Sequence, residues 1–96
     1  MPLFHFIGLD KPDHLALRMS VRPDHLEFAK DFVRLGGPLL DEHGQPMGSA
    51  MIVEAENLET AKVKLAQDPY AKAGLFESTF LRPWRVAIGT LQGYEG

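Results

Sequence analysis

The 96-residue sequence has no cysteine, no long hydrophobic run and no cluster of basic residues. Without cysteine the chain can form no disulfide, no thiolate nucleophile and no zinc site with thiolate ligands. No segment approaches the roughly 20 apolar residues that a membrane-spanning helix needs, so we expect no membrane partner. The ten lysines and arginines are scattered, and the formal net charge is −3. Because nucleic-acid binding depends on clustered cations, we expect no nucleic-acid partner.

The composition indicates one domain without a targeting segment. Hydrophobic residues make up 45% of the chain and charged residues 24%, which is ordinary for a soluble domain. We therefore expect residues 1–96 to form a single domain. Segment 3–9 is apolar, but His5 interrupts it and no positive residue precedes it, which favours a strand over a secretory signal. In the absence of an export signal, we expect the protein in the cytoplasm.

Hydrophobic periodicity and turn residues predict the regular elements. A buried strand is expected over 3–9, followed by a short helix over 13–19. Ser20 is expected to cap the main helix, which Gly36 would end in a left-handed conformation. The remaining predicted elements are a hairpin of strands 38–41 and 49–55, a helix that Asn57 caps and that ends before Pro69, one further turn over 69–73, and a strand over 76–82.

The order of these elements predicts the fold. The order is strand, helix, strand, strand, helix, strand. With right-handed crossovers, this order gives a four-stranded antiparallel sheet with the helices on one face. This is a ferredoxin-like α+β fold, βαββαβ. The predicted strands carry apolar residues on both sides, so the helix-free face of a monomer would be a large exposed apolar patch. We therefore expect a homodimer that pairs two sheets face to face.

His25 is the strongest candidate for chemistry. Helical spacing places it on the same face as Phe28 and Phe32, so it is predicted to point inward, while Asp68 ends the next helix. We place His25 near the start of its helix, where the dipole and burial both disfavour the imidazolium and a nearby carboxylate favours it. If the two residues meet, Asp68 would orient one ring nitrogen and the other would move a proton. The alternative is a structural pair that satisfies two buried polar groups.

Two arginines are candidates for binding an anionic ligand. Arg18 and Arg22 are four residues apart, so on a continuous helix they share a face and could bind a carboxylate or phenolate. The alternative is a solvated face, or ion pairs with Asp24 or Glu27.

The other candidates concern pocket lining and metal binding. His5, in the first strand, is a second candidate for lining a pocket, and Tyr70 and Trp84 could wall a pocket for a flat ligand. The alternative is that these aromatic residues pack over the ends of the core. None of the four histidines has the i, i+2 or i, i+4 spacing of a preorganised metal site, so we expect no metal.

Three motifs resemble those of the YciI-like (YCII-related) family of small dimeric α+β-barrel proteins. They are Arg18-x-x-x-Arg22-Pro23-x-His25-Leu26, Gly37-Pro38-Leu39 and Asp68-Pro69-Tyr70-x-x-Ala73-Gly74-Leu75, and the resemblance runs from the first strand to Pro83-Trp84. It implies the ferredoxin-like fold, dimerisation through the sheet, and a histidine–aspartate active site at His25 and Asp68. The surrounding superfamily includes isomerases, lyases, dehalogenating enzymes and oxygenases that act on small, often cyclic or aromatic compounds.

Three functional hypotheses follow from the residues and the resemblance together. The first is a cofactor-independent enzyme of the lyase, isomerase or dehalogenase type, acting on a small anionic or cyclic molecule. In it His25 is the general acid or base, Asp68 orients it, and Arg18 or Arg22 steers the substrate. The second is a non-catalytic small-ligand-binding or accessory domain, and the third is a purely structural dimerisation module.

Overall fold

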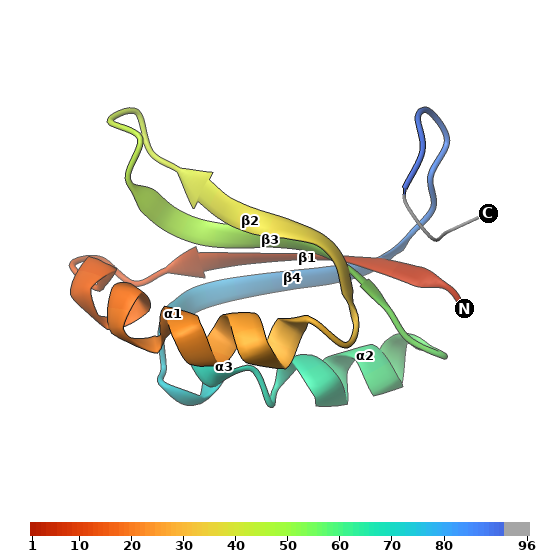
Figure 1. The fold of residues 1–96 in the computed structure, drawn as a ribbon, viewed down its shortest axis with the longest axis horizontal. Coiled ribbons are helices and arrows are strands. Elements are labelled where there is room, and N and C mark those ends of the chain that lie inside the picture. The colour runs from red at the N-terminus through yellow and green to blue at the C-terminus, as the bar shows by residue number, and fades with distance from the viewer. Residues whose placement is uncertain (92–96) are drawn as a thin grey trace.

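The computed structural model describes residues 1–91, which form a four-stranded antiparallel sheet with helices against one face (Figure 1). The elements are β1 Leu3–Asp10, α1 Leu15–Ala29, β2 Val33–Leu40, β3 Pro46–Glu54, α2 Leu58–Leu65, α3 Pro69–Lys72 and β4 Phe76–Trp84. The strand order is β2-β3-β1-β4, so β1 and β3 are central and β2 and β4 are the edges. This is the predicted ferredoxin-like α+β fold.

The core lies between the sheet and the helices. Alternation along β1 directs Phe4 and Phe6 toward the helices, and the strand register places Met51 and Leu81 on either side of Phe6. The buried cluster consists of Phe4, Phe6, Phe32, Met51, Val53, Ala55, Ala61 and Leu65. Fully burying one large apolar side chain contributes about 1.5–3 kcal/mol, so this cluster holds α1 and α2 onto the sheet.

Within residues 1–91, the other face of the sheet has no helix over it, because α1, α2 and α3 all lie on one side (Figure 1). Apolar side chains from three strands are exposed there. They are Leu9, Leu35, Phe80 and Trp84. This bare apolar face is the feature that the sequence predicted, and the homodimer inferred from it stays a prediction.

The first helix differs from the prediction of a short helix over 13–19 and a second one capped by Ser20. α1 is continuous through Pro23, and the Ser20 hydroxyl instead donates to the Leu17 carbonyl at 2.9 Å. A proline inside a helix costs about 3 kcal/mol. Arg18 before Pro23 and His25 after it are both buried, so contacts with the rest of the fold hold the two halves in one helix.

The end of this helix was also predicted wrongly. α1 stops at Ala29, and Gly36 and Gly37 lie inside β2 instead of ending a helix. The predicted strand over 38–41 is therefore only the second half of β2. Hydrogen bonding to β3, the next strand along the chain, keeps this glycine pair extended and overrides its local preference for a helix cap.

The second half of the chain follows the prediction closely. Asn57 caps α2, accepting the Thr60 N–H at 2.8 Å, and α2 ends before Pro69. The further predicted turn is α3, and Gly74 after it has a φ of +72°. Within residues 1–91, none of the helices has the length and hydrophobicity needed to cross a bilayer.

Candidate active site

His25 and Asp68 form a buried pair between α1 and the start of α3. The His25 Nδ1 lies 2.9 Å from Asp68 Oδ1 and 3.0 Å from Oδ2. A carboxylate only accepts hydrogen bonds, so Nδ1 carries the donated hydrogen, and Nε2 of a neutral ring is left with a free lone pair. His25 lies in the C-terminal half of α1, so the predicted influence of a helix N-terminus is wrong.

Local sequence explains why the Asp68 carboxylate faces His25. Asp68 is the N-cap of α3, where its Oδ1 also accepts the Tyr70 N–H at 2.9 Å, and Pro69 occupies the first turn. The Asp68 side chain is only 1% exposed. Capping and pairing therefore fix the carboxylate in one orientation, and through it the imidazole.

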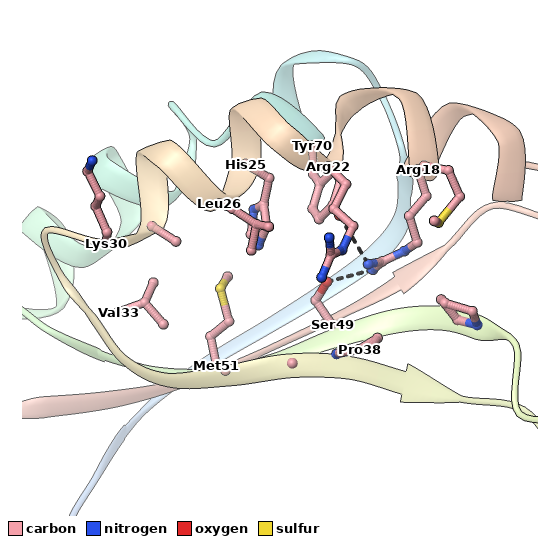
Figure 2. Close-up of a pocket in the computed structure, with 15 residues that line it drawn as sticks. Arg18, Arg22, His25, Leu26, Lys30, Val33, Pro38, Ser49, Met51 and Tyr70 are labelled. Carbon is pink, nitrogen blue, oxygen red and sulfur yellow. Dashed lines mark hydrogen bonds between the residues drawn. The ribbon is translucent and has the colours of Figure 1, made fainter. Parts of the chain in front are cut away.

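A cavity of about 530 Å³ opens between α1 and strands β2 and β3, and His25 lines it (Figure 2). Within residues 1–91, every fully buried side-chain nitrogen or oxygen has a hydrogen-bond partner. No protein group in that range bonds to Nε2 of His25, so this nitrogen is not fully buried, and the side chain that carries it lines the cavity. The cavity is also lined by Arg18, Arg22, Ser49, Met51 and Tyr70.

The buried side chain of Arg18, on α1, bonds to residues of β1, β3 and α3. Its Nε and Nη2 bond to the two carboxylate oxygens of Asp10 at 2.7 and 3.3 Å. Nη2 also donates to Ser49 Oγ at 2.6 Å, and Nη1 lies 3.4 Å from the Tyr70 hydroxyl. A guanidinium has five N–H groups, so these contacts leave one of them. Most of the hydrogen-bond donors of Arg18 are thus used within the protein.

Arg22 lines the same cavity from the next turn of α1, but its side chain is exposed. Neither arginine uses the ion pairs considered from sequence, because Arg18 pairs with a strand residue and Glu27 pairs with Lys30 at 2.8 Å. Within residues 1–91, Arg22 makes no hydrogen bond or ion pair with the protein. It is therefore the cation free to meet a ligand here.

Tyr70 lies between His25 and Arg18 (Figure 2). Its ring stacks on the imidazole with centroids 4.1 Å apart and an interplanar angle of 16°. The Arg18 Cζ lies 4.6 Å from the Tyr70 ring centroid. Burial raises the pKa of Tyr70 above its ordinary value of 10.0, although the charges of Arg18 and Arg22 partly oppose this. The phenol therefore stays neutral at neutral pH.

His5 is apart from the other candidates. Its neighbours in β1 face the helices, so His5 points to the bare side of the sheet, where its ring centroid lies 6.2 Å from that of Trp84. It does not line the cavity beside His25. The structure therefore brings together five of the six predicted site residues, and the role predicted for each of them stays a prediction.

Asp10 and Ser49 were missed from sequence. Ser49 alternates with Met51 and Val53 on the core side of β3, and a polar residue in that register was the available signal. Asp10 ends β1 without a comparable pattern, and its pairing with Arg18 arises only in the fold. Within the described residues, no group of three His, Asp or Glu side chains could hold a metal ion.

The fold and the site together define a class: ferredoxin-like α+β proteins with a buried histidine–aspartate pair beside a cavity. A family model described as the YCII-related domain matches residues 3–85. The chain belongs to the YCII-related domain family, which confirms the resemblance seen in its motifs.

Curated relatives support this membership along most of the chain. Protein YciI of Escherichia coli O6:H1 (strain CFT073) is 35% identical, over 86% of this chain and 96% of that protein. An uncharacterized protein of Haemophilus influenzae is 32% identical, over 79% of this chain and 89% of its own.

Solved structures share the fold. The 5-chloro-2-hydroxyhydroquinone dehydrochlorinase TftG of Burkholderia phenoliruptrix AC1100, in complex with 2,5-dihydroxybenzoquinone, superposes with a TM-score of 0.80 and 30% identity. That match covers 88% of this chain and 95% of the enzyme. An antibiotic biosynthesis monooxygenase matches with a TM-score of 0.59 at 9% identity over 92% of this chain and 100% of its own, a likeness of fold alone.

Proposed function

We propose that this protein is a cofactor-independent enzyme that acts on a small cyclic molecule by acid–base chemistry at His25. The observation that carries the proposal is that Asp68 holds Nδ1 of His25, while Nε2 has no partner within residues 1–91 and the side chain lines a cavity. A catalytic base needs both a fixed orientation and access to the proton that it removes.

The proposed step is proton removal from the substrate, followed by elimination or isomerisation. Nε2 of His25 takes the proton, and the electron pair of the broken bond forms a new double bond. In an elimination, the leaving group departs with its own bonding pair and the imidazolium then releases its proton to water. In an isomerisation, the imidazolium returns the proton to another carbon of the substrate. Asp68 stabilises the imidazolium, because a buried carboxylate beside Nδ1 favours the charged ring. Tyr70, stacked on the ring, keeps it from rotating.

The dehydrochlorinase TftG supports elimination as the reaction class. It is 30% identical over most of both chains, and its structure holds a dihydroxybenzoquinone. A hydroxylated ring of that kind suits the cavity here, which carries apolar side chains from α1 and β3 and one exposed arginine, Arg22. The alternative is a non-catalytic domain in which the same pair shapes a pocket for a small ligand.

The test is chloride release from 5-chloro-2-hydroxyhydroquinone and related halogenated hydroquinones. We expect His25→Gln to lower the rate by about 100-fold or more, because general acid–base catalysis contributes roughly 10²–10⁴-fold. Asp68→Asn should lower it strongly as well, since a neutral amide does not stabilise the imidazolium. His43→Gln is the matched control, because His43 lies at an exposed loop tip, and its rate should equal that of the wild type.

Two outcomes would count against this proposal. Equal chloride release by the wild type and His25→Gln would remove the catalytic role of the histidine. Saturable binding of the hydroquinones without turnover by any of the proteins would favour the ligand-binding alternative.

We propose further that the protein is a homodimer that pairs the bare faces of two sheets. Exposed apolar side chains from β1, β2 and β4 gather on that face, and water contact with such a patch is unfavourable. His5 lies on this face and would be covered in the dimer. The cavity beside His25 lies on the helix side and stays open in this arrangement.

A further inference from the structure

Ser49 is a buried serine whose hydroxyl hydrogen is not donated to any acceptor within residues 1–91. It lies in β3, is 2% exposed, and lines the cavity beside His25. Its Oγ lies 2.6 Å from Nη2 of Arg18. A guanidinium donates and never accepts, so the serine oxygen is the acceptor in this bond.

The hydroxyl hydrogen of Ser49 has no acceptor in the part of the chain that the structure describes. Within residues 1–91, the bond from Arg18 is the one hydrogen bond that Oγ makes. A buried donor without an acceptor is unfavourable, and a cation bonded to the oxygen makes the hydroxyl a stronger donor. The Ser49 O–H is therefore suited to an acceptor that enters the cavity.

The position of this donor is fixed by the protein. Asp10 binds Arg18 through both carboxylate oxygens, and the Tyr70 ring lies beside the same guanidinium. Arg18 is 4% exposed, so it has little room to change its conformation. Asp10 and Arg18 thus act as positioning residues for Ser49.

Arg22 adds a positive charge to the same part of the cavity. Arg18, Arg22 and His25 succeed one another along one face of α1, and Figure 2 shows the two arginines extending from α1 toward β3. Ser49 and Arg22 together offer a hydroxyl donor and an unpaired guanidinium, beside Nε2 of His25. The rest of the nearby lining is mainly apolar. It includes Met19, Leu26, Ala29, Val33 and Met51.

We propose that Ser49 and Arg22 form a subsite for one anionic oxygen of a small planar ligand, a carboxylate or a phenolate. The oxygen accepts the Ser49 O–H and pairs with Arg22, while the apolar body of the ligand packs against the adjoining side chains. This places the ligand beside His25. The inference rests on the proposed function, because it assigns the substrate class of the same cavity.

The test uses two probes of matched shape, benzoate and the uncharged benzamide, with binding followed by amide chemical shifts of the whole protein. We expect benzoate to shift signals of residues around Ser49 and to bind at least about tenfold more tightly than benzamide. Ser49→Ala and Arg22→Gln should each weaken benzoate binding by about tenfold, because a hydrogen bond to a charged group is lost. Arg22 is exposed, so its variant tests the subsite even if Ser49→Ala fails to fold.

Ser78→Ala and Arg82→Gln are the controls, because these residues belong to β4 and do not line this cavity. Both should bind benzoate as the wild type does. The proposal is overturned if benzoate causes no shifts at millimolar concentration, if benzamide binds equally well, or if both Ser49→Ala and Arg22→Gln bind benzoate normally.

His25→Gln separates this subsite from the catalytic proposal. Benzoate binding that survives this change but is weakened in Ser49→Ala and Arg22→Gln supports the subsite, whether or not turnover is found. If none of the proteins then turned over a substrate, the catalytic proposal would fail and the subsite would still stand.

Discussion

Asp68 combines two structural roles in this fold. As the N-cap of α3 it accepts the Tyr70 N–H, and as the partner of His25 it fixes the imidazole. Both roles require its short side chain at the start of a helix, directly before Pro69. The sequence could therefore identify Asp68 from local signals, although the pairing with His25 spans 43 residues.

The buried phenol of Tyr70 makes stability depend on pH in the alkaline range. Its pKa is raised in the folded protein, so above about pH 10 the unfolded chain loses a proton that the folded protein keeps. The wild-type free energy of unfolding should therefore fall by up to about 1.4 kcal/mol per pH unit through this group. This loss begins near pH 10 and continues until the folded phenol ionises.

Tyr70→Phe should remove that dependence. Urea unfolding between pH 8 and 11 is the measurement, and the difference between the two proteins cancels the titration of lysines common to both. We expect Tyr70→Phe to be the less stable protein at pH 8, because it lacks the hydroxyl near Arg18. The difference in the free energy of unfolding between the two proteins should narrow above pH 10. A constant difference would contradict the prediction.

At the scale of elements, α3 illustrates a position that local sequence defines well. Pro69 begins this short helix, Asp68 caps it, and Gly74 follows its end in a left-handed conformation with a φ of +72°. These residues carry their own conformational preferences, so the turn was predictable without knowledge of the sheet.

Gly74→Ala should destabilise the protein by about 1 kcal/mol, because a side chain is unfavourable at positive φ. A Cβ there would lie 3.6 Å from the Lys11 Nζ, so the penalty comes from the backbone and not from a clash. Urea unfolding of Gly74→Ala measures it. Gly37→Ala is the control, because a Cβ at Gly37 meets nothing within 4 Å, and its stability should not fall. Equal stability of both variants would refute the argument.

The first helix shows where local signals fail. Ser20 and Pro23 are a common start of a helix, and the glycine pair at 36–37 is a common end. Contacts remote in sequence override the start signal, because Arg18 before the proline binds Ser49 and His25 after it binds Asp68, 31 and 43 residues away. A pattern confined to 20 residues does not contain these partners.

At the scale of the whole molecule, the exposed sheet face predicts the state of assembly. Leu35 on this face is 62% exposed, and Val63 on α2 is 58% exposed, so the two form a matched pair. Leu35→Asp should weaken the proposed dimer and lower the mass measured by sedimentation at micromolar concentration. Val63→Asp should leave the mass at that of the dimer. A wild-type protein that sediments as a monomer would refute the sheet pairing.

Local patterns along the chain were enough to predict the fold class, the bare apolar face and the family, and they marked His25 and Asp68 as candidate site residues. These follow from hydrophobic periodicity, helix caps and short motifs, which are local properties of the chain. That residues 1–96 form one domain, and that the protein is cytoplasmic, stay predictions from the same source.

Which polar groups meet became visible in the folded arrangement of the elements. It paired Arg18 with Asp10 and Ser49, left Arg22 exposed at the cavity, and placed His5 on the opposite face of the sheet. A hydrogen bond depends on the distance between side chains from different elements, and packing of the sheet against α1 sets that distance. Sequence spacing therefore identifies candidate residues, whereas packing selects which of them can act together.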